Sequence, residues 1–176
     1  LRQRVMIAMA LMCGPKVLFA DEPTTALDVT VQAGILDLIA RLQRELGLAV
    51  VLVTHDLGVV ARLAHRLAIM YAGQIVESGP TRKVLNAPAH PYTRALIGCI
   101  PSVRDAAQAR LAPIPGQVPQ LEGRLEGCQF RNRCTLAMSV CGVEDPPVRA
   151  PGEGWQARCH LHTAQPLPPS EIGENR

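Results

Sequence analysis

The sequence is poor in aromatic side chains and contains no long hydrophobic run. Only 3% of its 176 residues are Phe, Trp or Tyr, so aliphatic side chains must supply most of the core packing. No apolar stretch approaches the roughly 20 residues that a bilayer-spanning helix needs, so we expect no such helix. The sequence also begins at Leu1 without an initiator methionine or a signal-peptide pattern. We expect that truncation, rather than processing, removed an N-terminal part.

The sequence also carries little excess of basic charge, because its formal net charge is only +3. Residues 1–80 carry seven basic and seven acidic side chains, whereas residues 81–176 carry eleven and eight. So small an excess does not make the clustered basic face of a nucleic-acid-binding protein, and we expect no nucleic-acid partner. Twelve of the fifteen prolines follow residue 80, and four of the six cysteines follow residue 120. The first half therefore reads as a regular core and the second half as a loop-rich module.

Hydrophobic periodicity predicts alternating helices and strands in the first 80 residues. Helices are expected over 1–13, 29–46 and 58–64, and strands over 17–20, 49–53, 66–71 and 74–77. The last two strands read as a hairpin, and the runs over 17–20 and 49–53 read as strands buried on both faces. The predicted fold class is α/β, a largely parallel sheet with flanking helices. Beyond residue 80 we expect only a helical turn over 82–85 and a short helix over 91–99.

Polar residues follow both predicted parallel strands, at the ends where such sheets gather their chemistry. Asp21 and Glu22 follow the first strand, and His55 follows the second. Adjacent carboxylates point to opposite faces, so they divide the work: Asp21 would bind Mg²⁺, usually through water, and Glu22 would polarise an attacking water as general base. His55 could contact a γ-phosphate. The alternative is that the two carboxylates cap the following helix, favoured by its dipole.

Four segments in this order resemble the C-terminal half of an ABC-type nucleotide-binding domain. They are Leu1-Arg2-Gln3-Arg4, Val17-Leu18-Phe19-Ala20-Asp21-Glu22-Pro23, Ala26-Leu27-Asp28 and His55. The resemblance implies ATP and Mg²⁺ as cofactors, a Walker B strand with catalytic Glu22, a D-loop with Asp28 at the dimer interface and an H-loop at His55. It also implies a second ABC ATPase subunit, identical or different, as partner. No Gly-x-x-x-x-Gly-Lys-[Ser/Thr] occurs, so we expect a fragment that binds ATP weakly and is inactive alone.

Three further segments resemble the ATP-binding subunits of oligopeptide and dipeptide importers. They are Tyr71-Ala72-Gly73-Gln74-Ile75-Val76-Glu77, Val84-Leu85-Asn86-Ala87-Pro88 and His90-Pro91-Tyr92-Thr93-Arg94-Ala95-Leu96. This resemblance implies a peripheral ATPase on the cytoplasmic face of the inner membrane. Its partners would be transmembrane permease subunits and, indirectly, an extracytoplasmic peptide-binding protein. The predicted domains are an ATPase part over 1–80, an extension and linker over 81–127, a four-cysteine metal-binding module over 128–162 and a flexible tail over 163–176.

Four cysteines, Cys128, Cys134, Cys141 and Cys159, are spaced as C-x5-C-x6-C-x17-C. The spacing lacks the C-x2-C pairs of zinc ribbons, and a cytosolic ATPase should not hold two structural disulfides. The residues therefore favour a metal centre, either a [4Fe–4S] cluster or Zn²⁺. Likeness to the cysteine-bearing tail of peptide-importer ATPases implies the cluster. Near it we expect charge-compensating arginines and a shielding Trp155, or else ordinary surface residues, and we expect the other cysteines, Cys13 and Cys99, to be small buried hydrophobes. The arginines are Arg131, Arg133 and Arg158.

Two other functions fit parts of the sequence. The ABC-like core could serve a soluble DNA-repair or chromosome-structure ATPase, but such proteins carry coiled-coil arms and no sustained heptad occurs here. Alternatively, the chain could be an ABC-like core with a metal-cluster regulatory or redox-sensing module. The segment over 90–96, together with Asp21, Glu22 and His55, favours the transport ATPase.

Overall fold

The computed structural model describes residues 2–25, 27–100, 113–120 and 126–162. The chain divides into two compact units, Leu1–Leu63 and Ala64–Arg176. The expected linker over 101–127 falls mostly outside the described residues, and the expected tail over 163–176 falls wholly outside them. Within the described part of the chain, no helix is long and apolar enough to cross a bilayer.

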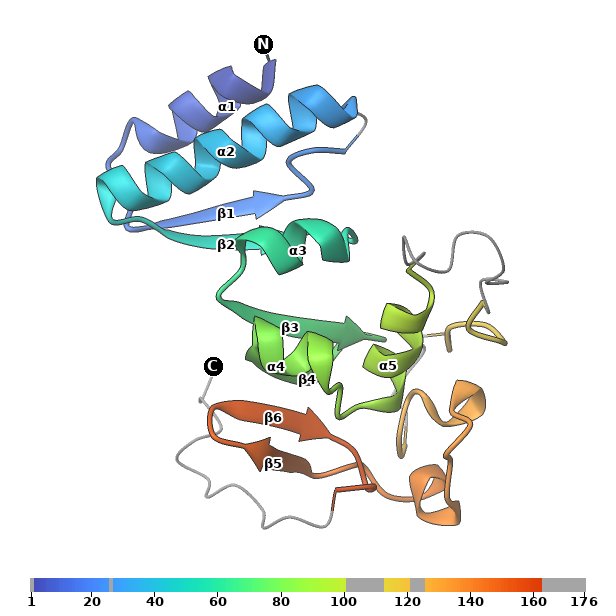
Figure 1. The fold of residues 1–176 in the computed structure, drawn as a ribbon. Helices are drawn as coiled ribbons and strands as arrows, with labels where there is room; N and C mark the ends of the chain where they lie inside the picture. Colours follow the sequence, from blue (N-terminus) through green and yellow to red (C-terminus); the bar gives the residue numbers. More distant parts are fainter. Residues whose placement is uncertain (1, 26, 101–112, 121–125, 163–176) are drawn as a thin grey trace. The chain divides into compact units, whose positions relative to one another are not determined.

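The first unit holds three helices and a parallel strand pair (Figure 1). The helices are α1 (Arg2–Leu11), α2 (Val29–Leu46) and α3 (Leu57–Leu63), and the strands are β1 (Val17–Asp21) and β2 (Ala49–Val53). Each strand lies within a residue of its predicted range, and their parallel pairing, from Val17 with Ala49 to Asp21 with Val53, confirms the expected α/β pattern. Gly47 ends α2 in the left-handed conformation that its lack of a side chain permits.

Only one face of the β1–β2 pair is buried within this unit. Leu18 of β1 is buried together with apolar side chains of the helices, whereas Phe19 is 74% exposed. Val51, the neighbour of Phe19 in the parallel register, is also exposed. The expectation of burial on both faces is therefore wrong for these strands, because a continuous apolar run does not specify which faces are covered. The buried helical residues are Ile35, Leu36, Ile39, Val59 and Val60.

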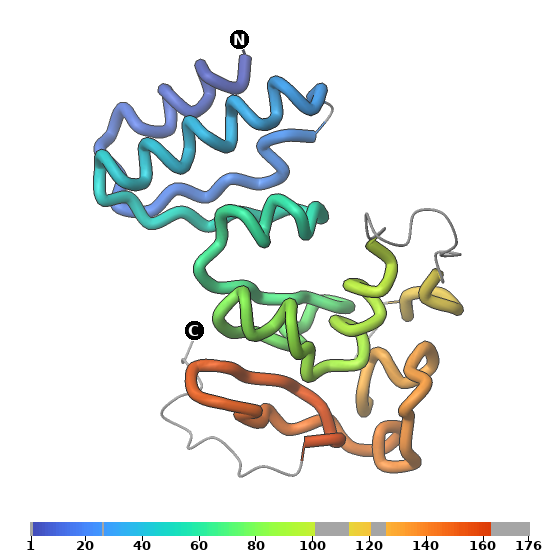
Figure 2. Tube along the Cα trace, in the orientation of Figure 1, coloured from blue at the N-terminus to red at the C-terminus, as the bar shows by residue number. Residues whose placement is uncertain are grey.

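The second unit is built on a four-stranded antiparallel sheet in the order β3-β4-β6-β5. The expected hairpin is formed by β3 (Arg66–Tyr71) and β4 (Gln74–Pro80), and it turns at Ala72-Gly73. The hairpin of β5 (Val148–Gly152) and β6 (Trp155–Arg158) was not predicted; it joins the sheet through Glu77, which is paired with Ala157. The path from β4 through α4 (Thr81–Asn86) and α5 (Pro91–Gly98) is followed most easily in Figure 2. Two 3₁₀ turns, η1 (Arg131–Arg133) and η2 (Ser139–Gly142), lie in the cysteine segment.

Candidate functional site

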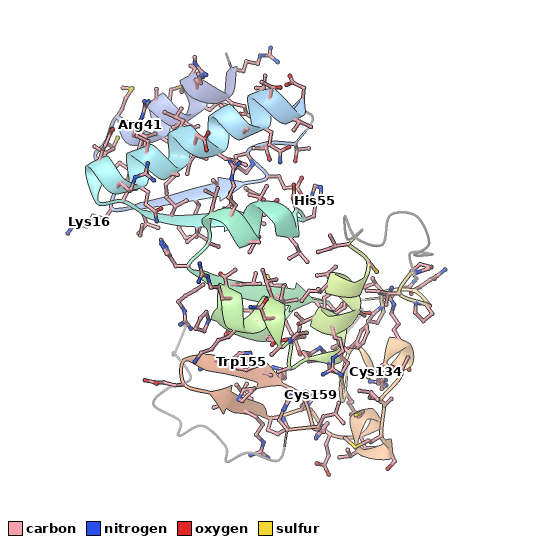
Figure 3. All side chains as sticks on the ribbon, in the orientation of Figure 1. Lys16, Arg41, His55, Cys134, Trp155 and Cys159 are labelled. Atoms are coloured by element: carbon pink, nitrogen blue, oxygen red, sulfur yellow. The ribbon has the colours of Figure 1, made fainter. Side chains whose placement is uncertain are left out.

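The first candidate site lies where β1 and β2 end. His55 Nδ1 is 3.0 Å from Glu22 Oε1, and the Glu22 backbone N–H donates to the Val53 carbonyl at 2.9 Å. Parallel neighbours bring residues that follow them to one edge of the sheet, which explains why two residues 33 positions apart meet. The His55 side chain, labelled in Figure 3, is 79% exposed and that of Glu22 is 45% exposed. The pair is thus open to a ligand.

Thr25 also forms hydrogen bonds with Glu22. Its Oγ1 donates to Glu22 Oε2 at 2.7 Å, while its backbone N–H donates to the Glu22 carbonyl at 3.1 Å. These bonds, the side-chain bond to Thr25 first and the bond to His55 second, lower the pKa of Glu22 below its ordinary value of 4.5. Glu22 also has φ 41°, in the left-handed region that a side chain with a Cβ rarely adopts. The site therefore holds a fully ionised carboxylate in a strained position.

The other two acidic residues, Asp21 and Asp28, have different structural roles. Asp21 is the exposed last residue of β1. Asp28 caps α2, because its Oδ1 accepts the Val31 N–H at 2.9 Å. The capping role considered for Asp21 and Glu22 is thus filled by Asp28, which leaves the first two carboxylates available for other chemistry.

The second candidate site is a pocket lined by all four cysteines of the C-x5-C-x6-C-x17-C pattern. Cys128 follows Gly127, and its N–H donates to the Cys141 carbonyl at 2.8 Å, which joins the two ends of the loop. Cys134 follows η1, and Cys159 follows β6; both are labelled in Figure 3. All four are free thiols, with Cys141 and Cys159 buried. The four cysteines therefore line one pocket, and their role as metal ligands stays a prediction.

Burial makes three of these thiols hard to ionise. It raises the pKa of Cys128 and Cys134, and it raises the pKa of Cys159 to about 11, with neighbouring thiols adding to each increase. A cation in the pocket would reverse this tendency, because a coordinated thiol loses its proton. The donor set is therefore chemically suited to a soft metal centre but not to free thiolates.

The cysteines do not, however, converge tightly on a point. Among the described residues, no group of three or more His, Cys, Asp or Glu side chains is arranged to hold a metal ion. A tetrahedral Zn²⁺ at about 2.3 Å from each sulfur needs its four sulfurs roughly 3.8 Å apart. The arrangement gives no support to such a single-ion site. The described side chains likewise give no direct support to an iron–sulfur cluster.

An aromatic cluster attaches the cysteine loop to the rest of its unit. Phe130, 2% exposed, lies between Cys128 and Cys134, and its ring centroid is 5.3 Å from those of both Tyr71 and Tyr92. The Tyr71 and Tyr92 centroids are 4.7 Å apart. Most of the few aromatic residues are therefore used here, where β3, α5 and the cysteine loop meet.

The structure separates the residues expected beside the cysteines. Arg131 lines the pocket, but Arg133 donates to the Pro115 carbonyl and to the Tyr71 hydroxyl. Arg158 donates to the Pro146 carbonyl, and Trp155 Nε1–H donates to Glu77 Oε1 at 2.9 Å instead of shielding the pocket. Cys13 is exposed, so its expected burial is wrong, because α1 has no buried residue.

Sequence reasoning missed three residues of these sites: Thr25, Glu77 and His90. Thr25 had a usable signal, because Glu-Pro-Thr-Thr is a turn sequence that returns its fourth residue to its first. Glu77 is 1% exposed, although a glutamate in a hairpin strand ordinarily faces solvent. His90 is also 1% exposed and lines the cysteine pocket. Neither burial could be read locally, because it depends on contacts with distant segments.

Comparison with known proteins shows which class of protein this chain resembles. Residues 76–141 match the family described as "Oligopeptide/dipeptide transporter, C-terminal region". Over 90% of its length the chain is also about half identical to ATP-binding proteins of peptide import. The chain is therefore similar, over most of its own length, to ATP-binding proteins of peptide and dipeptide transport.

Among these relatives is the dipeptide transport ATP-binding protein DppD of Escherichia coli (strain K12). It is 49% identical over 158 residues, which cover 90% of this chain and 48% of the relative. DppD of Shigella flexneri matches with the same identity and coverage. This chain thus spans about half the length of both. A dimeric post-hydrolysis structure of the ATP-binding cassette MJ0796 with ADP and Pi aligns at 37% identity and a TM-score of 0.42, covering 46% of this chain and 34% of that one.

Proposed function

We propose that the chain forms part of an ATP-hydrolysing subunit that powers uptake of oligopeptides or dipeptides through an ABC permease. The observation that carries the proposal is the Glu22 carboxylate, held between Thr25 and His55 at the open edge of a parallel strand pair. The relatives, which are peptide-transport ATP-binding proteins, indicate the substrate class.

In this mechanism Glu22 orients and deprotonates the attacking water, since its low pKa keeps it ionised at neutral pH. His55 Nδ1, now beside Glu22, lies on an exposed side chain that can contact the terminal phosphate of a nucleotide. Asp21 would hold Mg²⁺, which neutralises charge on the phosphates. Asp28, at the start of α2, is proposed to face a second ATP-binding subunit across the nucleotide.

Replacing Glu22 by Gln in the intact ATP-binding protein tests this role. The amide keeps the side-chain shape but cannot accept a proton, so we expect ATP hydrolysis to fall about 10²–10⁴-fold while ATP binding remains. The measurement is steady-state phosphate release together with nucleotide binding by calorimetry. Glu45→Gln is the matched control, because Glu45 is 61% exposed on α2, where it forms an exposed ion pair with Arg41. Unchanged turnover in Glu22→Gln would remove Glu22 from the base role.

The partners proposed for the intact protein are a second ABC ATPase subunit and transmembrane permease subunits at the cytoplasmic face of the inner membrane. An extracytoplasmic peptide-binding protein would act through the permease. Because the sequence has no phosphate-binding loop, we also propose that these 176 residues bind ATP weakly on their own. Sub-millimolar affinity in calorimetry would contradict that.

For the second site we propose a [4Fe–4S] cluster held by Cys128, Cys134, Cys141 and Cys159. Support comes from the shared pocket and the free thiols that line it. Such a cluster would supply one-electron redox chemistry or a structural cross-link. An ABC-like core with a regulatory or redox-sensing module is the alternative function, and this pocket is the observation that favours it.

Spectroscopy of the anaerobically purified chain tests the cluster. We expect a broad band near ~400 nm with about four iron and four sulfide per chain. Cys159→Ser should reduce both, whereas Cys13→Ser, at an exposed cysteine remote in sequence, should leave them unchanged. About one zinc per chain without a visible band would replace the cluster by a Cys₄ zinc site. Protein with neither metal would contradict both forms.

A further inference from the structure

Asp56 is a carboxylate beside the first candidate site that the proposed hydrolysis does not use. It directly follows His55, and its Oδ1 accepts the backbone N–H groups of Gly58 at 2.8 Å and Val59 at 3.2 Å. These two bonds cap the first turn of α3, whose N–H groups have no partner within the helix. A Cβ at Gly58 would lie 3.1 Å from the same Oδ1, so the glycine leaves room for the cap. Asp56 is therefore held in place at the start of α3.

The other carboxylate oxygen of Asp56 binds a second helix. Oδ2 accepts the Gln32 Nε2–H at 3.3 Å, and Gln32 lies in the first turn of α2. The Gln32 backbone N–H donates to the carbonyl of Asp28, the N-cap of that helix, at 2.8 Å. Asp56 and Gln32 are both half-buried, so water competes less for this bond than it does at an exposed pair. One carboxylate thus joins the starts of α2 and α3.

His55 lies between two anchored positions of the backbone. On one side, the Val53 carbonyl accepts the Glu22 N–H at 2.9 Å. On the other side, the Asp56 N–H donates to Thr54 Oγ1 at 3.1 Å, which closes a turn around His55. The His55 side chain is 79% exposed, so packing does not hold the ring 3.0 Å from Glu22 Oε1. The backbone on both sides must therefore supply most of the order that keeps the ring there.

We propose that Asp56 is a positioning residue for the proposed hydrolysis: by capping α3 and binding Gln32 of α2, it holds His55 where the ring reaches Glu22. The inference rests on the proposed function for its effect on turnover, but the placement of His55 can be tested without it. An ionised Glu22 carboxylate only accepts hydrogen bonds, so the nitrogen beside it, His55 Nδ1, carries a proton. The tautomer of the neutral ring thus reports whether His55 is in place.

Four variants separate positioning from general stability. Asp56→Ala removes both the cap and the bond to α2, whereas Gln32→Met removes only the bond. Asp56→Asn is the conservative variant, because Asn retains a capping oxygen and its amide can bond the Gln32 amide. Asp37→Asn is the matched control. Asp37 of α2 also binds α3, through Arg62 at 3.2 Å, but this pair is exposed and Arg62 lies in the last turn of α3.

The first measurement is the imidazole tautomer of His55 in this chain. Long-range ¹H–¹⁵N correlation spectra at about pH 9, above the range in which histidines ordinarily titrate, show which ring nitrogen is protonated. We expect the proton on Nδ1 in the unmodified chain, in Asp56→Asn and in Asp37→Asn. In Asp56→Ala it should move towards Nε2, which an unbonded imidazole favours. Gln32→Met should show the same direction of change, and it decides the outcome if Asp56→Ala does not fold.

Two results of these spectra would overturn the proposal. One is a proton that stays on Nδ1 in Asp56→Ala or in Gln32→Met, because His55 would then keep its place without the bonds of Asp56. The other is a proton on Nε2 in the unmodified chain, because the ring would then not donate to Glu22 at all.

The second measurement is steady-state ATP hydrolysis by the intact ATP-binding protein. Displacing a group that acts on the chemical step lowers kcat, so we expect Asp56→Ala to reduce kcat about 10–10²-fold with little change in KM for ATP. Asp56→Asn and Asp37→Asn should retain turnover near the original value. Equal losses of kcat in Asp56→Ala and Asp37→Asn would show that any link between α2 and α3 has this effect, and would contradict the positioning role.

Glu22→Gln, measured alongside, distinguishes the failure of one proposal from the failure of the other. If its turnover is unchanged, the proposed role of Glu22 fails, and the spectra alone decide whether Asp56 holds His55 in place. If Glu22→Gln is impaired while Asp56→Ala hydrolyses ATP normally, the proposed function stands and the positioning role of Asp56 is wrong.

Discussion

At the scale of single residues, Glu22 shows how two short hydrogen bonds prepare a carboxylate for chemistry. Thr25 and His55 each engage one of its oxygens, and both lower its pKa. A group with a depressed pKa in the folded state stays charged to lower pH than the free group. Its contribution to stability is present above about pH 4.5 and is lost as the pH falls through the depressed pKa.

Thr25→Val should raise the pKa of Glu22 towards 4.5, because valine keeps the shape of threonine but removes the O–H donor. The measurement is a ¹³C NMR titration of the Glu22 carboxyl in the chain itself. Thr25→Ser retains the donor and should restore the low pKa. In the intact ATP-binding protein, the acidic limb of the hydrolysis rate should move to higher pH in Thr25→Val. A Glu22 titration that is the same in all three proteins would show that the hydroxyl does not act on the carboxylate.

Single residues also show which features of the structure the sequence does not predict. That Glu22 and His55 meet follows from two apolar runs, each ending in polar residues at the same edge of a sheet. That Glu77 and His90 are buried does not follow, because each lies in a segment whose local pattern is compatible with exposure. The burial of Glu77 arises when the β5–β6 hairpin pairs with β4, and that of His90 when the cysteine loop packs on the segment that follows β4.

At the scale of elements, the regular part of the fold was predictable and the cysteine module was not. α2 and the β3–β4 hairpin have clear periods and turn residues, and they occur where those patterns place them. β5 contains Arg149 and Pro151, which give no alternating pattern, and β6 is only four residues long. β6 pairs with β4, and β5 pairs with β6; no local signal encodes the pairing with the distant strand β4.

Gly127 fixes the geometry of the cysteine loop at the element scale. It has φ +69°, and a Cβ at this position would lie 2.5 Å from the Cys141 carbonyl oxygen. We expect Gly127→Ala to destabilise the second unit by at least about 1–2 kcal/mol, since both the left-handed backbone and the contact with main chain resist a side chain. Urea unfolding of the second unit measures this, followed through Trp155, the single tryptophan of the chain.

Gly142→Ala is the matched control within the same loop. A Cβ at Gly142 meets nothing within 4 Å, and its φ lies outside the left-handed range. Its unfolding midpoint should remain close to that of the unmodified chain. Equal losses in the two variants would show that the loop tolerates no added methyl group, whatever the backbone geometry.

At the scale of the whole molecule, the division between Leu63 and Ala64 differs from the one expected at residue 80. The expected ATPase part, residues 1–80, includes the β3–β4 hairpin, yet the strands of this hairpin share a sheet with β6 of the cysteine module. Compact units are defined by packing, and motifs are defined by chemistry, so their boundaries need not coincide.

Cys134→Ser should therefore affect one unit and spare the other. We expect amide protection to fall around η1 and η2, because the pocket loses one of the four sulfurs that line it, while β1, β2 and α2 keep theirs. Hydrogen exchange with mass spectrometry measures both units in one experiment. Loss of protection in α2 would show that the two units unfold together.

The left-handed backbone conformation of Glu22 bears on the balance between stability and activity. A residue with a side chain at φ 41° raises the energy of the folded state, and glycine would relieve that strain. Glycine at this position would also remove the carboxylate that Thr25 and His55 engage. The backbone is thus strained at the point where the proposed chemistry takes place, and selection for thermostability alone would favour losing the carboxylate there.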